Sequence, residues 1–154
     1  MTPPAHRLLF VCSGNICRSP MAEAWARALG AEQGRAVEAR SGGTLDIRGR
    51  PADPLAVRVM GECGVDIAGH RSQGLDATLV GWAHHIFVME LRHQAWLREH
   101  LPACQDRVLL LGPFGGVGEV PDPLGGWRWR FRRSRDLLRR CVATALAQLP
   151  PPTG

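Results

Sequence analysis

The sequence predicts a single α/β domain with three layers, in which a parallel sheet lies between helices. Its 154 residues, 45% of them apolar, are enough for one compact core. Short apolar segments alternate with segments of helical spacing, and this alternation is typical of a parallel sheet with helices on both faces. No repeat or linker divides the chain, so we expect one domain over residues 1–154, with its core at about 7–149.

The strands and helices can be placed from their apolar spacing and their end signals. The strand candidates are Arg7–Val11, Ala36–Ser41, 84–89 and 107–111. The helix candidates are a segment that opens at Ser19-Pro20 and ends at Gly34, a second from Asp53-Pro54 to Gly64, a third over about 91–100 and a last one from Trp127 to Leu149. Six Gly and three Pro make residues 112–126 a loop.

Composition favours a soluble cytoplasmic protein. The net charge is +5 and every one of the 19 basic residues is Arg, which fits a codon bias better than nucleic-acid binding. No apolar run approaches the ~18 residues of a membrane span, and no signal-peptide pattern is present. Five scattered Cys suit a reducing compartment and form no metal-ligand pattern. We therefore expect no metal, no cofactor, no nucleic acid and no membrane partner.

The loop after the first strand carries the strongest functional signal. Cys12 stands at the carboxyl end of the strand, and Arg18 follows six positions later at the start of a helix. Such a short loop can curl into a nest of backbone N–H groups that binds a tetrahedral dianion, helped by the helix N-terminus and a bidentate Arg18. Cys12 at the bottom of the nest is placed as a thiolate nucleophile for a covalent phosphocysteine. Gly14 relieves crowding, and Asn15 tolerates a left-handed conformation.

The run Val11-Cys12-Ser13-Gly14-Asn15-Ile16-Cys17-Arg18-Ser19-Pro20 resembles the signature of the low-molecular-weight protein-tyrosine phosphatases. The likeness continues in order through Ser41-Gly42-Gly43-Thr44, Pro51-Ala52-Asp53-Pro54, Gly69-His70-Arg71-Ser72, Val88-Met89-Glu90 and Val120-Pro121-Asp122-Pro123.

The resemblance implies a four-stranded parallel sheet and a metal-free phosphatase acting on phosphorylated proteins. It implies Cys12 and Arg18 as catalytic residues, and residues 13–17 as the phosphate loop. It also implies a polar network that supports the loop, formed by Asn15, Ser19, Ser41 and His70, in which Ser19 donates to the Cys12 thiolate.

Asp122 is the candidate general acid and base. It lies between two prolines that stiffen the loop, and by its family position it would protonate the leaving oxygen and later accept a proton from water. Asp53 is instead expected to cap the helix at Pro54.

Two positions bear on specificity. Leu124 stands where the family commonly has an aromatic wall residue, which weakens the expectation of strict phosphotyrosine preference. Relatives that act on phosphoarginine tend to have Thr at position 16, so Ile16 favours an aryl phosphate substrate.

Alternatives remain open. An arsenate reductase on the same fold would need a Cys pair after the His70 region, and no Cys lies between Cys63 and Cys104. A non-enzymatic phosphate- or phosphoprotein-binding module would be expected to have lost the nucleophile, the Arg or the acid, and all three are present.

Two further features allow more than one interpretation. Cys17 either traps an oxidised Cys12 as a disulfide or only packs. Arg128, Arg132, Arg135 and Arg139 form a stripe on the last helix, which either is a solvated face or lies near the pocket mouth and attracts acidic substrates.

Overall fold

The computed structural model describes residues 4–150, and its centre is a sheet of four parallel strands. The strands are β1 (His6–Cys12), β2 (Val37–Gly43), β3 (His85–Val88) and β4 (Val108–Leu110). Their order across the sheet is β2-β1-β3-β4, and all three pairings are parallel. β1 pairs with β2 along its whole length, from His6 against Val37 to Cys12 against Gly43. The predicted parallel sheet is confirmed.

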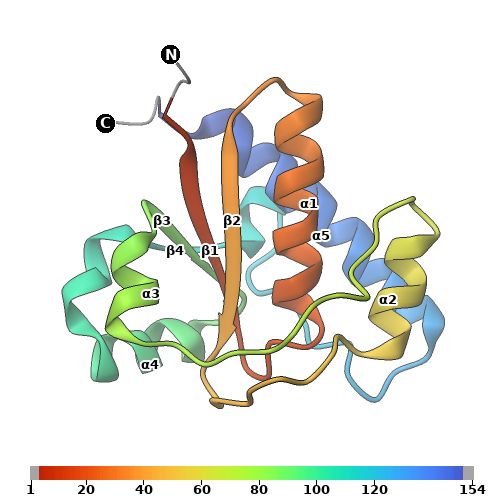
Figure 1. The fold of residues 1–154 in the computed structure, drawn as a ribbon, viewed down its shortest axis with the longest axis horizontal. Coiled ribbons are helices and arrows are strands. Elements are labelled where there is room, and N and C mark those ends of the chain that lie inside the picture. The colour runs from red at the N-terminus through yellow and green to blue at the C-terminus, as the bar shows by residue number, and fades with distance from the viewer. Residues whose placement is uncertain (1–3, 151–154) are drawn as a thin grey trace.

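Helices cover both faces of this sheet. They are α1 (Arg18–Glu32), α2 (Pro54–Gly61), α3 (Ala77–Trp82), α4 (Leu91–His100) and α5 (Arg128–Gln148), with short 3₁₀ turns η1 (Pro102–Arg107) and η2 (Gly112–Gly115). Figure 1 shows α1, α2 and α5 on one side of the sheet and α3 and α4 on the other. Alternate residues of β1 serve the two sides, because Leu8 and Phe10 join the core under α1 and α5 while Leu9 and Val11 join the core under α3 and α4.

Most predicted helix ends agree with the structure, with two corrections. The side chain of Asp53 caps α2 as expected, accepting a hydrogen bond of 2.9 Å from the Leu55 amide. α1, however, begins at Arg18, and its N-cap position is Cys17, so Ser19 is not the cap. The sequence reading missed α3, a six-residue helix that Asp76 caps through the Leu79 amide.

The long helix α5 buries a mostly apolar face against the core. Its inward residues are Phe131, Ser134, Leu138, Cys141, Val142, Ala145 and Leu146. Of the four arginines in the predicted stripe, three make contacts with other helices, and Arg128 is exposed. Arg132 and Arg135 both bind Glu62, just after α2, at 2.6 and 2.8 Å, and Arg139 lies over the ring of Trp25. These three arginines hold helices together and do not line a pocket mouth.

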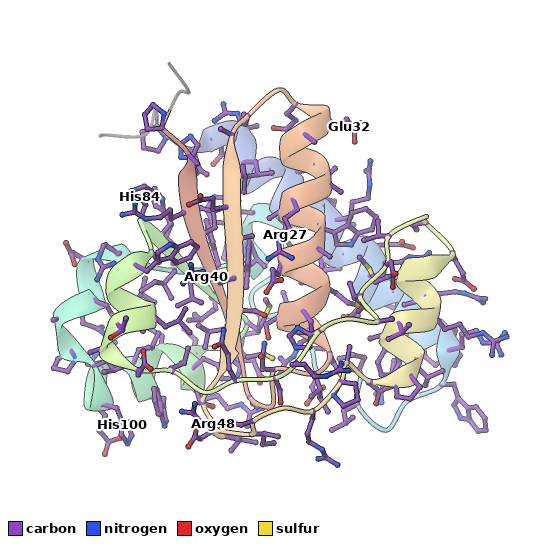
Figure 2. The ribbon with its side chains drawn as sticks, viewed as in Figure 1. Arg27, Glu32, Arg40, Arg48, His84 and His100 are labelled. Atoms are coloured by element: carbon purple, nitrogen blue, oxygen red, sulfur yellow. The ribbon has the colours of Figure 1, made fainter. Side chains whose placement is uncertain are left out.

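The carboxyl ends of the strands meet at one edge of the molecule. Figure 1 shows this edge at the tip of the β2 arrow, where the loop from β1 to α1 turns, and Figure 2 places Arg48, from the segment after β2, at the same edge. Ligands of open parallel sheets bind at such an edge. Within residues 4–150, no helix combines the length and apolar content that crossing a bilayer requires.

Candidate active site

The loop that joins β1 to α1 directs its carbonyl groups outward. Four of these carbonyls accept hydrogen bonds from outside the loop: Cys12 from the Thr44 amide (3.1 Å), Ser13 from the Leu45 amide (3.0 Å), Asn15 from Nε2 of His70 (2.7 Å) and Ile16 from the Asp53 amide (2.8 Å). The amides of residues 13–18 have no hydrogen-bond partner among residues 4–150. The loop therefore presents its N–H groups together at the start of α1, where an anion would bind.

Asn15 and Gly43 keep the loop curled. Asn15 has the left-handed conformation expected for it, with φ of 58°, and is fully buried. Its Oδ1 accepts from the Gln73 amide at 2.9 Å, which fixes the orientation of the side-chain amide. Gly43 lies so close behind the loop that a Cβ there would stand 2.5 Å from the carbonyl oxygen of Ser13. A side chain at position 43 would push the loop forward.

The sulfur of Cys12 lies 2.9 Å from the hydroxyl of Ser19. Nδ2 of Asn15 donates to the same hydroxyl oxygen at 2.8 Å, which leaves the Ser19 hydrogen free to be donated to the sulfur. Cys12, Asn15 and Ser19 are all buried. A hydroxyl that donates to sulfur stabilises a thiolate, both before attack and when it departs from a covalent intermediate.

Arg18 is buried to 1% exposure and is held by one end of its guanidinium group. Its Nη1 donates to Oε2 of Glu90 at 2.7 Å and to the carbonyl of Val120 at 2.8 Å. Nη2 stands 3.8 Å from Oδ2 of Asp122. The edge formed by Nε and Nη2 carries no hydrogen bond to any residue of the described chain, and that edge has the fork geometry suited to two phosphate oxygens.

A buried histidine that the sequence reading missed supports the loop from the other side of the sheet. The ring of His93 is 1% exposed, and burial lowers its pKa from 6.5 to about 4. Its Nδ1 accepts from the Glu90 amide at 3.1 Å, so in the neutral ring Nε2 carries the hydrogen and donates to Oγ of Ser13 at 2.9 Å. One side chain therefore connects the residue after Cys12 with Glu90, the carboxylate that holds Arg18.

The candidate acid lies on a much more exposed segment. Asp122 has a side chain 39% exposed and accepts one hydrogen bond, from the Leu124 amide to Oδ1 at 3.0 Å. Its other oxygen is the one that faces Arg18. Leu124 follows at 54% exposure. The structure thus brings Asp122 beside Arg18 and leaves the side chain of Leu124, two residues further on, exposed.

The two remaining support residues behave differently. His70 contacts the loop directly through the Asn15 carbonyl. The hydroxyl of Ser41 instead donates to Glu23 at 2.7 Å, and only the Ser41 carbonyl approaches the network, as acceptor from Nε2 of Gln73. Gln73, which the sequence reading did not single out, joins Ser41 to Asn15.

A hollow of about 780 Å³ lies behind this support, between α1 and residues 64–73, and reaches Ser41 and His70. No residue of the 12–18 loop lines it, so it is not the anion site. In the described part of the chain, no three His, Cys, Asp or Glu residues come together as metal ligands.

The rest of the loop packs inward or lines the opening. Gly14 and Ile16 are half-buried, and Ile16 packs against the core. Cys17 is 4% exposed, and burial, followed by the nearby Asp53 carboxylate, raises the pKa of its thiol well above the ordinary value. A thiol that stays protonated attacks an oxidised sulfur slowly, because the thiolate is the nucleophile. This favours packing as the role of Cys17.

The profile of the family described as low molecular weight phosphotyrosine protein phosphatase matches residues 7–151. The chain belongs to this family. It is 37% identical over 139 residues to a protein-arginine-phosphatase of Geobacillus stearothermophilus, covering 89% of this chain and 91% of the relative. It is 33% identical to the low molecular weight protein-tyrosine-phosphatase Wzb of Escherichia coli K12, covering 88% and 89%.

The fold agrees with that of solved family members. The low molecular weight protein tyrosine phosphatase of T. tengcongensis superposes with a TM-score of 0.89 at 33% identity, covering 94% of this chain and 100% of that one. The predicted family and fold class are confirmed.

Proposed function

We propose that this protein is a phosphatase that hydrolyses phosphotyrosine-type groups in proteins through a phosphocysteine intermediate. In the first step the Cys12 thiolate attacks phosphorus in line, a P–S bond forms, and the P–O bond to the leaving group breaks. Asp122 gives its proton to the departing oxygen. The free amides of residues 13–18 and the open edge of Arg18 bind the phosphoryl oxygens throughout.

The second step hydrolyses the intermediate. Asp122, now a carboxylate, accepts a proton from water as the water oxygen attacks phosphorus. The P–S bond breaks, and the Ser19 hydroxyl, 2.9 Å from the sulfur, stabilises the departing thiolate. Inorganic phosphate leaves, and the enzyme regains a thiolate and a protonated acid.

A single observation carries the proposal. The carbonyls of the loop accept hydrogen bonds from residues outside it, while its amides stay free around a cysteine sulfur. A structural loop would use both kinds of group, because unsatisfied amides are costly. The position of Asp122 beside Arg18, at 3.8 Å, supports turnover in addition to binding.

Two substrate classes compete for this site. Ile16 favours an aryl phosphate, while the aliphatic side chain of Leu124 makes the preference for phosphotyrosine less strict. The 37% identity to a protein named for arginine phosphatase activity favours phosphoarginine as the second candidate. The attacking thiolate and the nest serve both reactions, since the transferred group is the same.

Paired substrates test the proposal. Purified protein is given phosphotyrosine, phosphoserine and phosphoarginine in peptides of one sequence, with free phosphate as the measured product. We expect phosphotyrosine to give the highest kcat/KM. A higher value for phosphoarginine would transfer the assignment to the second candidate. Phosphate release from none of them, with arsenate reduced in the presence of a thiol donor, would overturn both.

We also propose a cytoplasmic location and phosphorylated protein as the partner. All five cysteines are free, two of them in the loop itself, which is a state that a reducing compartment maintains. The proposed reaction requires no cofactor, because the nucleophile, the anion site and the proton donor are all side chains or amides of the chain.

A further inference from the structure

Two exposed tryptophans stand at the start of α5, next to the loop that carries Asp122. Trp127 is 79% exposed and Trp129 is 54% exposed, although both could bury a large apolar area. Trp127 follows Asp122 by five residues, and the tight turn between them is closed by a hydrogen bond from the Gly126 amide to the Pro123 carbonyl. The tryptophans therefore follow directly on the loop that brings Asp122 to the candidate active site.

The arginines around these rings differ from those further along α5. Arg128, Arg130 and Arg133 are exposed and form no ion pair within residues 4–150, whereas Arg132 and Arg135 are bound to Glu62. Arg133 stands over the Trp129 ring at 5.9 Å.

One of these three arginines, Arg130, contacts the end of the loop that carries Asp122. The side chain of Arg130 packs so closely over Gly126 that a Cβ at position 126 would clash with its Cδ. No Asp or Glu occurs between Asp122 and Asp136, so nothing in this stretch of the sequence neutralises the three free guanidinium groups.

We propose that Trp127, Arg128, Trp129, Arg130 and Arg133, here called the rim patch, bind an acidic segment of the phosphoprotein beside the phosphorylated residue. The inference rests on the proposed phosphatase function and adds that the substrate is acidic beside its phosphorylated residue. Charge complementarity identifies the occupant: three unpaired guanidinium groups without a carboxylate attract a negatively charged chain. The exposed rings supply apolar contact to side chains between its acidic residues.

Two phosphotyrosine peptides test this, one with Asp and Glu on both sides of the phosphotyrosine and one with Asn and Gln there. We expect wild type to prefer the acidic peptide by about three- to tenfold in kcat/KM, because each exposed ion pair contributes little. Arg128→Gln/Arg130→Gln should abolish that preference, and Trp127→Ala/Trp129→Ala should raise KM for both peptides. Both double variants should hydrolyse p-nitrophenyl phosphate at the wild-type rate.

A matched control removes the same charge elsewhere. Arg58→Gln/Arg98→Gln lacks two arginines that are also exposed, one on α2 and one on α4, and should keep the peptide preference. An unchanged preference in Arg128→Gln/Arg130→Gln, or an equal loss with p-nitrophenyl phosphate, would overturn the proposal.

Further arms separate this proposal from its alternatives. Sedimentation of wild type with anionic phospholipid vesicles, together with equal kcat/KM for the two peptides, would instead make the rim patch a membrane contact and overturn the proposal. A wild-type protein inactive on p-nitrophenyl phosphate as well as on both peptides would mean that the phosphatase function itself has failed.

Discussion

The two loops that form the candidate active site are held in opposite ways. Four carbonyls of residues 12–18 are held by three separate segments, and the side chains of Cys12, Asn15, Arg18 and Ser19 are buried. The loop with Asp122 is exposed, and the acid itself accepts one hydrogen bond from its own turn. The anion nest is therefore preorganised, so little energy is spent arranging it around a transition state, while the acid can follow leaving groups of different shape.

Because of this difference, we expect the largest loss of activity from a substitution in the nest. Cys12→Ser should lower kcat by about 10⁴-fold or more, because a neutral hydroxyl cannot replace the thiolate. The free amides and Arg18 remain, so inorganic phosphate should still bind, as calorimetry would measure. Cys63→Ser, which removes an exposed thiol, is the matched control and should keep full activity. Loss of phosphate binding in Cys12→Ser would contradict a nest organised independently of the sulfur.

The acid loop should fail selectively. Asp122→Ala should lower kcat by about 10²- to 10³-fold with alkyl-like leaving groups and much less with acidic phenols, since these depart without a proton. Its free energy of unfolding should change by less than about 0.5 kcal/mol, because Asp122 is exposed. Asp106→Ala removes an exposed carboxylate from η1 and serves as control. A uniform loss across leaving groups would remove Asp122 from the acid role.

Some residues of the site could be predicted from the sequence and others could not. Residues whose role lies in the local backbone, such as Asn15 at positive φ and Asp53 as a cap, could be predicted because their neighbours in sequence determine it. The role of His93 could not be predicted, because the side chains that follow Leu91, those of Arg92, His93 and Gln94, are polar and are typical of a surface helix. His93 is buried and donates to Ser13 only because the tertiary packing brings α4 to the loop after β1.

Ser19 and Arg132 show the complementary error. A Ser before a Pro favours an N-cap, yet the sulfur of Cys12 and the amide of Asn15 both compete for this hydroxyl within hydrogen-bonding distance. An arginine on the outer side of a helix favours solvent, yet the tertiary packing of α2 brings Glu62 to Arg132. Both cases depend on contacts between elements, which local spacing does not encode.

The support of the nest should be sensitive to acid. The pKa of His93 is lowered by burial from 6.5 to about 4, so the unfolded chain binds its proton first as the pH falls. Above pH 6.5 the ring is neutral in both states, and the free energy of unfolding is unaffected by its titration. Between about pH 6.5 and 4 the unfolded chain is protonated first, so the free energy of unfolding falls. One pKa unit corresponds to about 1.36 kcal/mol, so wild type should lose about 2–3 kcal/mol from this group between pH 7 and 4.5.

His93→Gln separates this contribution from other titrations. The Gln amide can still donate to Ser13 but cannot be protonated. Urea unfolding at pH 7 and 4.5 should show a smaller loss in the variant than in wild type, by about 2–3 kcal/mol. Parallel losses in the two proteins would show that His93 is not the neutral support that the geometry indicates.

The smallest expected effect is at Leu124, on the exposed side of the comparison. Its side chain is 54% exposed beside Asp122, so it can contact a leaving group but does not hold the loop. A Tyr at this position would add ring stacking worth about 0.5–1.5 kcal/mol, which corresponds to roughly two- to tenfold in kcat/KM. Leu124→Tyr should therefore improve phosphotyrosine peptides several-fold and leave inhibition by inorganic phosphate nearly unchanged, because the nest is untouched. Leu45→Tyr, at a residue of the segment after β2 that is 63% exposed and whose amide binds the Ser13 carbonyl, is the matched substitution for comparison. If Leu124→Tyr leaves phosphotyrosine turnover unchanged while phosphoarginine turnover falls, the exposed Leu124 side chain serves a flexible guanidinium chain, and the second candidate substrate becomes the better assignment.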